Sequence, residues 1–163
     1  MKGLFSVRLG RLSYLLAAIV VALDQATKAF IVHGLDMTVG MSREVLGPIH
    51  FTFIYNTGFS FGLMQDTPWG RWALSAFSLI VSIALAVWAW KAVRPWLAAG
   101  IGLIMGGALG NLVDRVLIGH VIDFVDFGRI FPFIFNVADA SITFGVIFLI
   151  YDQFMTPQPK AAP

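Results

Sequence analysis

The chain has 163 residues, of which 58% are hydrophobic and 12% are charged, and its formal net charge is +2. A soluble domain carries roughly 25% charged residues, so this composition excludes an ordinary soluble enzyme, a disordered chain and a nucleic-acid-binding protein. The chain contains no cysteine, which excludes a disulfide scaffold, a thiol nucleophile and a cysteine-bound metal. We therefore expect an integral membrane protein with a single domain over residues 1–163.

Four stretches are apolar enough and long enough to cross a bilayer, which takes about 20 residues in a helix. They cover residues 12–32, 72–90, 96–118 and 134–154. The first stretch follows Lys2, Arg8 and Arg11 and so resembles a signal peptide, but its apolar pattern continues past Asp24 without an A-x-A cleavage site. We expect a retained first span and a mainly helical membrane protein.

Glycines mark one face of the third stretch, where Gly102, Gly106 and Gly110 recur at every fourth position. This spacing is typical of a helix face on which a neighbouring helix packs closely. Close packing explains these glycines without a functional role.

Basic residues predict the orientation, because short cytoplasmic loops are enriched in Lys and Arg. Six basic residues lie before the first span, between the second and third spans, and after the fourth span: Lys2, Arg8, Arg11, Lys91, Arg94 and Lys160. Only Arg43 and Arg129 lie clearly within the other two connections. We expect both termini and the tail 155–163 in the cytoplasm, with outer loops over 33–71 and 119–133. Two interfacial belts of tryptophan fit this topology: Trp69 and Trp72 outside, and Trp88, Trp90 and Trp96 inside.

The first outer loop is long for a connector. Apolar residues at Ile49, Phe51, Phe53 and Tyr55 alternate with mostly polar ones, and this period of two predicts a strand. Gly58-x-x-x-Gly62 suggests a turn or a second short strand. We expect a small sheet on the outer membrane surface, and we expect the aromatic second outer loop to form a short interfacial segment.

Four aspartates fall in the same outer leaflet. At 1.5 Å per residue, Asp24 lies about 18 Å into the first span, Asp114 lies near the outer end of the third, and Asp123 lies just beyond it. Asp139 falls in the first turns of the fourth span. Ionisable residues inside a membrane are costly and therefore suggest function. Two aspartates that share a proton in a partly dry site form an acid and base pair, in which one accepts a proton from water while the other polarises a carbonyl.

Simpler roles are available for some of these side chains. Asp24 and Lys28, four residues apart on one helix, could neutralise each other. Asp114 could form a structural ion pair with the adjacent Arg115. The sequence Asn136-Val-Ala-Asp139 could cap the fourth helix. Capping, however, explains one carboxylate and not four in one layer.

Other chemistries fit the sequence less well. Gly58-Phe-Ser60-Phe-Gly62 matches G-x-S-x-G, and Asp114 and His120 follow it in triad order, but that motif requires a large α/β sheet. The three histidines show no metal-binding spacing. Asp126 is expected to be an ordinary loop acid.

Two functions outside hydrolysis also need consideration. A proton-coupled carrier could use Asp24, Asp114 and Asp139 as a relay, but the inner halves of the second and third spans carry no ionisable residue. A non-catalytic membrane adaptor would have no need for paired carboxylates, and it would tolerate replacement of Asp123 by asparagine.

Five blocks of residues occur in order along this topology. They are Asp24–Lys28, Asn56–Gly62, Gly106–Arg115, Val121–Phe124 and Phe135–Ala140. Together they resemble signal peptidase II, the lipoprotein signal peptidase family of bacteria, and the resemblance covers nearly the whole chain.

The resemblance implies a four-helix aspartyl endopeptidase of the bacterial cytoplasmic (inner) membrane, with a small periplasmic β-sheet and an active site near the periplasmic face. Its substrates would be prolipoproteins carrying a diacylglyceryl-cysteine, cut on the amino side of that cysteine. The resemblance assigns the catalytic dyad to Asp123 and Asp139. Residues that match positions holding the substrate or globomycin-type inhibitors are Asp24, Asn56, Asn111, Asp114, Arg115 and Asn136. The expected partners are the prolipoprotein and membrane lipid, with no cofactor, metal or nucleic acid.

Overall fold

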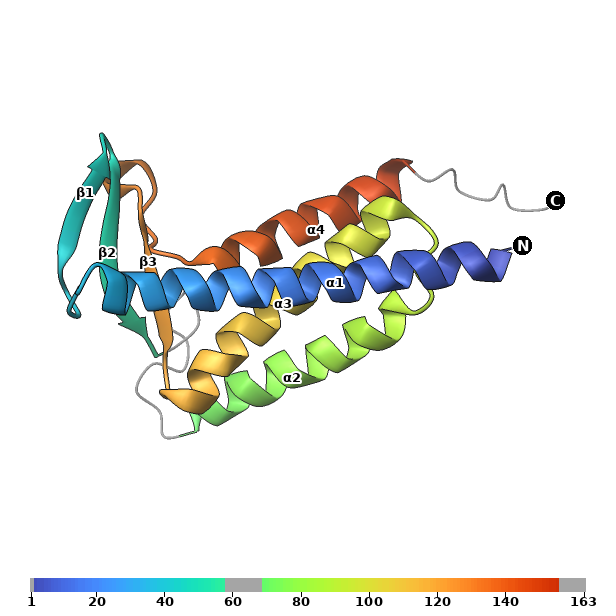
Figure 1. The fold of residues 1–163 in the computed structure, drawn as a ribbon, viewed down its shortest axis with the longest axis horizontal. Helices are drawn as coiled ribbons and strands as arrows, with labels where there is room; N and C mark the ends of the chain where they lie inside the picture. Colours follow the sequence, from blue (N-terminus) through green and yellow to red (C-terminus); the bar gives the residue numbers. More distant parts are fainter. Residues whose placement is uncertain (1, 58–68, 156–163) are drawn as a thin grey trace.

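The computed structural model describes residues 2–57 and 69–155, with side chains from residue 9 onward. Figure 1 shows a helix bundle with a small sheet at one end. The helices are α1 (Lys2–Ala29), α2 (Gly70–Ala89), α3 (Pro95–Leu117) and α4 (Val137–Met155), with a π-helical turn η1 (Phe30–Gly34) extending α1. The strands are β1 (Ser42–Leu46), β2 (Ile49–Asn56) and β3 (Val121–Asp126), and a 3-10 turn η2 (Gly128–Ile130) follows β3. The predicted turn at 58–62 lies outside the described residues.

The helices have the length and composition of membrane spans. Among the residues that the structure describes, four segments qualify: Leu9–Gly34, Gly70–Ala89, Pro95–Leu117 and Val137–Met155. Their outward side chains are large and apolar, and include Leu15, Ile80, Ile83, Phe144 and Ile147. A helix that is apolar on its outer face as well as its inner face is suited to lipid. The predicted class, a mainly helical membrane protein with a small sheet, is confirmed.

Helix α3 lies at the centre of the bundle and packs against the other three helices. A Cβ added to Gly106 would lie 2.8 Å from the Ala17 carbonyl oxygen of α1, and one on Gly145 of α4 would lie 2.8 Å from the Gly100 carbonyl oxygen of α3. Such distances leave no room for a side chain, so the glycines let the helix backbones approach closely. Close packing therefore accounts for the glycine spacing in α3.

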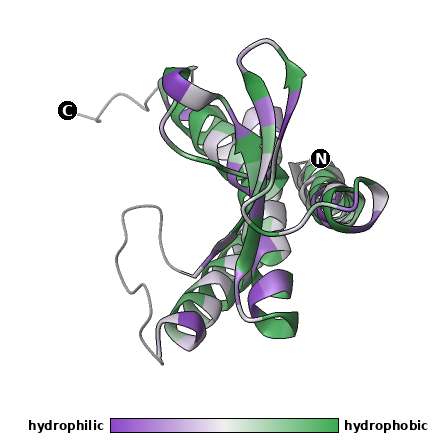
Figure 2. Ribbon diagram, turned by 90° about the vertical axis from the view of Figure 1, so that its left-hand side faces the viewer, coloured by the Kyte–Doolittle hydropathy of each residue, from purple (hydrophilic) through white to green (hydrophobic). Residues whose placement is uncertain are grey.

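The sheet is antiparallel with the order β1-β2-β3. The strand predicted over residues 49–56 is confirmed as β2, whereas the sequence did not predict β1 or β3. In the pairing of β2 with β3, Ile54 lies opposite Asp123 and Asn56 lies opposite Val121. The sheet is attached to the end of α1 through an apolar cluster of Ile31, Met37, Phe53 and Phe124. Figure 2 shows the strands lying across the end of the bundle.

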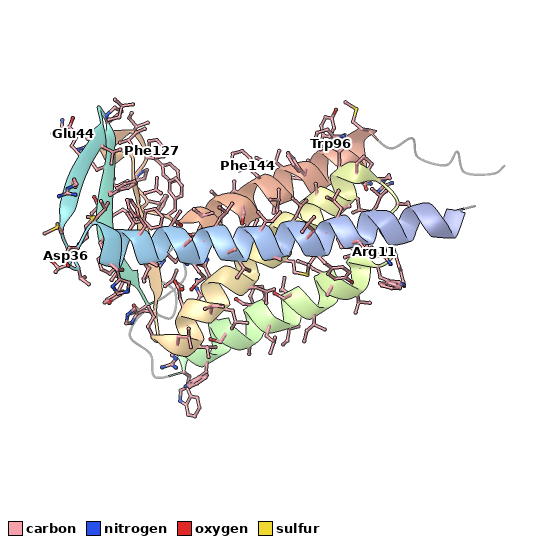
Figure 3. All side chains as sticks on the ribbon, viewed as in Figure 1. Arg11, Asp36, Glu44, Trp96, Phe127 and Phe144 are labelled. Atoms are coloured by element: carbon pink, nitrogen blue, oxygen red, sulfur yellow. The ribbon has the colours of Figure 1, made fainter. Side chains whose placement is uncertain are left out.

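Helix α4 begins at Val137, three residues after the start of the apolar stretch. Phe135 forms a β-bridge with Val125 instead of joining the helix, and Asn136 then caps it. The start of α1 and the end of α4 both lie at the end of the molecule away from the sheet (Figure 1). Arg11 and Trp96 lie near that end, while Asp36 and Glu44 lie at the sheet (Figure 3).

Candidate active site

Asp139 lies in the first turn of α4, where Asn136 caps the helix. The backbone N–H of Asp139 donates to Asn136 Oδ1 at 2.9 Å, and the backbone N–H of Asn136 donates to Asp139 Oδ2 at 3.4 Å. This reciprocal arrangement is a capping box, as the N-x-x-D spacing predicts. It holds the Asp139 carboxylate at the positively polarised end of α4.

Asp123 lies in the middle of β3 and is completely buried, with 0% exposure. Asn56 of β2 lies opposite Val121, so it is a diagonal neighbour of Asp123 on the same face of the sheet. Asn56 Nδ2 donates to Asp123 Oδ2 at 2.9 Å, and Asn136 Nδ2 donates to Asp123 Oδ1 at 2.7 Å. Both carboxylate oxygens of Asp123 therefore accept hydrogen bonds from amides.

The surroundings of Asp123 change its acidity. Burial, and then the nearby charge of Asp139, raise the pKa of Asp123 to about 7 from its ordinary value of 3.8. The hydrogen bonds from Asn56 and Asn136 and the charge of Lys28 act in the opposite direction but do not cancel this rise in the pKa. The Asp123 carboxyl is therefore partly protonated near neutral pH.

Two asparagine side chains join the aspartates from β3 and α4. Besides its bond to Asp123, Asn136 Nδ2 donates to Asn111 Oδ1 at 3.0 Å. Asn111 Nδ2 in turn donates to Asp139 Oδ1 at 2.8 Å. The structure thus brings Asp123 and Asp139 into one hydrogen-bonded network, although they belong to a strand and a helix.

A buried cation lies at the other side of this network. Lys28 Nζ is 2.7 Å from Asp24 Oδ2 and 2.8 Å from Asp114 Oδ2. The predicted pairing of Asp24 with Lys28 is confirmed. Within the described residues, Asp114 pairs with Lys28 and makes no ion pair with Arg115. Breaking a buried ion pair by removing one partner costs about 3–5 kcal/mol, so this cluster is important for the fold.

These two aspartates also accept hydrogen bonds from backbone and side-chain donors. Asp24 Oδ1 accepts the backbone N–H of Ala138 in α4 at 3.0 Å, and Asp114 Oδ2 accepts that of Ile122 in β3 at 3.1 Å. Gln25 Nε2 donates to Asp114 Oδ1 at 2.8 Å. The cluster therefore holds α4 and β3 against α1 and α3. Gln25 cannot be recognised as a site residue from the sequence, because a single glutamine on a helix has no distinguishing pattern.

A cavity of about 860 Å³ lies between α2 and α4 and against α3. Its lining is mostly apolar and includes Leu74, Phe77, Val81, Ile104, Ala108, Phe127, Phe131, Phe135, Ile142 and Phe144. Phe127 lies beside the sheet and Phe144 lies along α4 (Figure 3). The charged residues that line the described part of this cavity are Arg115 and Asp139. Such a cavity suits a large apolar ligand that presents one polar group to Asp139.

The predicted site residues fall into two groups. Those that line the cavity are Asn56, Asn111, Arg115 and Asp139. Those that are buried behind its wall are Asp24, Asp114, Asp123 and Asn136. All except Arg115 share the hydrogen-bonded network, and Arg115 lies within electrostatic range of Asp123 and Asp139. Ser60 of the G-x-S-x-G match lies outside the described residues, and the ring of His120 packs against Tyr55 with 3.6 Å between centroids.

Comparison with known proteins decides the family. The sequence model of the family described as signal peptidase (SPase) II matches residues 16–155. The chain is 50% identical over 162 residues to the lipoprotein signal peptidase of Caulobacter vibrioides, covering 98% of this chain and 96% of that protein. It is 40% identical over 163 residues to that of Pseudomonas putida, covering 94% and 93%. The chain belongs to the signal peptidase II family.

Solved structures agree with this membership. One described as a bacterial membrane enzyme superimposes with a TM-score of 0.78 at 35% identity, covering 93% of this chain and 94% of that one. A second with the same description has a TM-score of 0.76 at 36% identity, covering 89% and 94%. Members of the signal peptidase II family are proteases, so this chain is a multi-pass membrane hydrolase.

Proposed function

We propose that the protein is a lipoprotein signal peptidase of the bacterial inner membrane that uses an aspartyl dyad. It removes the signal peptide from prolipoproteins whose cysteine carries a diacylglyceryl group, and it cuts on the amino side of that cysteine. The observation that carries the proposal is that Asp139, on the cavity wall, is linked through Asn136 to the buried Asp123. The relatives described above, which are named lipoprotein signal peptidases, support the substrate class.

The dyad supplies the chemistry of amide hydrolysis. With the pKa of Asp123 at about 7, Asp123 and Asp139 together hold one proton near neutral pH, as coupled carboxylates do. The ionised member accepts a proton from the attacking water, and the protonated member polarises the scissile carbonyl. The tetrahedral intermediate then collapses when the leaving nitrogen receives a proton from the pair. This route needs neither a metal nor a covalent intermediate.

The cavity supplies the place for the lipid. Helices α2 and α4 pack against α3 and hardly contact each other, so the cavity between them is accessible from the bilayer. Acyl chains of the substrate enter laterally and lie against residues such as Val81 and Phe144. Globomycin-type inhibitors occupy the same cavity. Asn56, Asn111 and Arg115, next to Asp139 on the cavity wall, hold the polar backbone of the substrate or inhibitor.

The other predicted binding residues do not line the cavity and act by positioning the segments that do. Asp24 and Asp114 accept hydrogen bonds from the backbones of α4 and β3, which places the segments that carry Asp139 and Asp123. Asn136 contacts both aspartates of the dyad directly. These three residues therefore support substrate binding through the positions of others.

The charge distribution supports the orientation. Arg11 lies near the end of the bundle away from the sheet (Figure 3). The connection between α2 and α3, which contains Lys91 and Arg94, lies at the same end (Figure 1). The positive-inside rule assigns this end to the cytoplasm. Both termini then lie in the cytoplasm. The sheet, the dyad and the polar end of the cavity lie near the periplasmic face, where the precursor's cysteine is presented.

A gel-shift assay in detergent micelles tests the proposal. Wild type, Asp123→Asn and Asp139→Asn are incubated with a diacylglyceryl-modified prolipoprotein, with and without globomycin. We expect cleavage by wild type alone, and we expect globomycin to block it. Removing an acid or base from a catalytic pair lowers the rate by about 10²- to 10⁴-fold.

Two controls make the result specific. Asp126→Asn changes a carboxylate of the same strand whose oxygens bind Thr52 and the Gly128 N–H, and it should cleave like wild type. A precursor with serine in place of its cysteine cannot be lipid-modified and should stay intact. Undiminished cleavage by Asp123→Asn or Asp139→Asn would remove that residue from the dyad. Folded wild type that leaves the lipid-modified precursor intact would refute the proposed substrate.

A further inference from the structure

Lys28 is a fully buried cation in a membrane helix, and its side chain has more partners than charge neutralisation requires. Its ammonium, on a residue with 2% exposure, contacts Asp24 and Asp114 and also donates to Asn111 Oδ1 at 3.2 Å. The third contact connects the buried ion pairs to the wall of the cavity, because Asn111 lines that cavity and Lys28 does not.

The contact with Lys28 determines how the Asn111 amide is oriented. An ammonium group has only donors, so it can face the oxygen of an amide but not its nitrogen. Asn136 Nδ2 is a second donor to the same oxygen. With Oδ1 held by both donors, Asn111 Nδ2 must point the other way, where it donates to Asp139 Oδ1 at 2.8 Å.

We infer that Lys28 is a positioning residue for hydrolysis: it fixes the Asn111 amide so that its N–H group always faces Asp139. It acts through Asn111 and does not touch the substrate. This inference rests on the proposed function, because it assumes that Asp139 takes part in cleavage.

The charge of Lys28 acts on the dyad as well. Charged groups face Asp123 from three elements: Lys28 on α1, Arg115 on α3 and Asp139 on α4. From β2, Asn56 contributes an uncharged amide. Lys28 lowers the pKa of Asp123, so removal of its charge should move the titration of Asp123 to higher pH.

The first test measures cleavage by Lys28→Met. We expect kcat to fall by about 100-fold, as when a catalytic group is misplaced by about 1 Å, and we expect KM to change little. Because this variant leaves two buried carboxylates with no cation, Asp24→Asn/Lys28→Met is made in parallel. It removes one charge of each sign and so keeps the net charge of the cluster. Ser13→Ala is the matched control, since Ser13 is buried on the same helix and its hydroxyl donates to the Ala98 carbonyl.

A double-mutant cycle then asks whether Lys28 acts through Asn111. If it does, adding Asn111→Leu to the lysine variant should lower kcat no further than Asn111→Leu alone. If the losses in kcat caused by the two single substitutions multiply in the combined variant, the inference is overturned. A kcat within twofold of wild type in a folded lysine variant would overturn it as well.

An infrared titration provides a readout that does not depend on cleavage. The carboxyl band that disappears in Asp123→Asn should titrate at higher pH in Lys28→Met than in wild type and in Ser13→Ala. An unchanged midpoint would overturn the role of Lys28. Absence of cleavage by wild type together with a shifted midpoint would refute the proposed function and leave the coupling between Lys28 and Asp123 standing.

Discussion

The side-chain amide of Asn136 donates a hydrogen bond of 2.7 Å to Asp123, and its side-chain oxygen Oδ1 caps α4, the helix that carries Asp139 in its first turn. One residue therefore fixes the start of α4 and links Asp123 to the helix that carries Asp139. Because the cap determines where the first turn begins, it also determines where the Asp139 carboxylate lies relative to β3.

The first prediction separates the two roles of Asn136. Serine keeps an oxygen that can cap the helix but has no amide donor, whereas alanine has neither. We expect Asn136→Ala to be less stable than Asn136→Ser by about 0.5–2 kcal/mol, the usual value of an N-cap. We expect both variants to cleave about 100-fold more slowly than wild type, since both lose the donor to Asp123. Thermal unfolding and cleavage rates check this, and normal cleavage by Asn136→Ser would show that the amide bridge is dispensable.

The second prediction concerns pH. The pKa of Asp123 is raised from 3.8 to about 7 by folding, so the folded protein binds more protons than the unfolded chain between these values. Stability therefore falls as pH rises through this window. Asp123→Asn should lose this dependence when unfolding is measured from about pH 4 to about pH 8. Cleavage should decline above about pH 7, where the pair loses its shared proton.

Asp126→Asn is the control for the pH prediction. Hydrogen bonds from Thr52 and the Gly128 N–H lower the pKa of Asp126, so its contribution to stability is lost only at more acidic pH. The stability of this variant should therefore fall between about pH 4 and about pH 8 as it does in wild type. If the stability of Asp123→Asn still fell with rising pH as in wild type, a group other than Asp123 would be responsible for the pH dependence.

The third prediction tests the close approach of α1 and α3. A Cβ on Gly106 would lie 2.7 Å from the Val20 Cβ and 2.8 Å from the Ala17 carbonyl oxygen. Because one of these atoms belongs to the backbone, the helices must separate. Gly106→Ala should therefore lower the free energy of unfolding by about 1–3 kcal/mol, which is typical of overpacking. Leu117→Ala, at a position of α3 with 74% exposure, should change it far less.

The fourth prediction tests the lipid site. Val81 of α2 lines the cavity, so Val81→Trp would fill part of the space proposed for acyl chains. We expect KM for the lipid-modified precursor to rise about tenfold with a smaller change in kcat, as when binding of substrate and transition state are weakened equally. Val87→Trp, on the same helix at a position with 62% exposure, should cleave normally. An unchanged KM in Val81→Trp would argue against this cavity as the lipid site.

Much of the fold could be predicted from the sequence because its signals are local. Apolar runs interrupted by a few charges predict four helices, and the alternation around Phe53 predicts β2. The strand β3 was not predicted, since its six residues include Asp123 and Asp126 and carry no clear alternation. Its pairing with β2 depends on residues more than sixty positions away.

For the candidate site as well, the sequence predicted what depends on local geometry, and tertiary packing decided the rest. Membrane depth alone predicted that Asp24, Asp114, Asp123 and Asp139 share one layer, because each helix rises by a fixed 1.5 Å per residue. Depth does not reveal which side of a helix faces which neighbour. The packing of α1 and α4 against the glycines of α3 determined that Asp139 faces the cavity while Asp24 and Asp114 bind Lys28.

The sequence by itself therefore determined the membrane class, the number of helices and the layer in which the acids lie, since hydropathy and helical rise are properties of short segments. Only the tertiary structure decided that Asp24 binds the Ala138 N–H, 114 residues away, and that Asn136 joins Asp123 to Asp139. These contacts form because a buried carboxylate or amide is stable only when its hydrogen bonds are satisfied. In this protein the partners that satisfy them come from other helices and from the sheet.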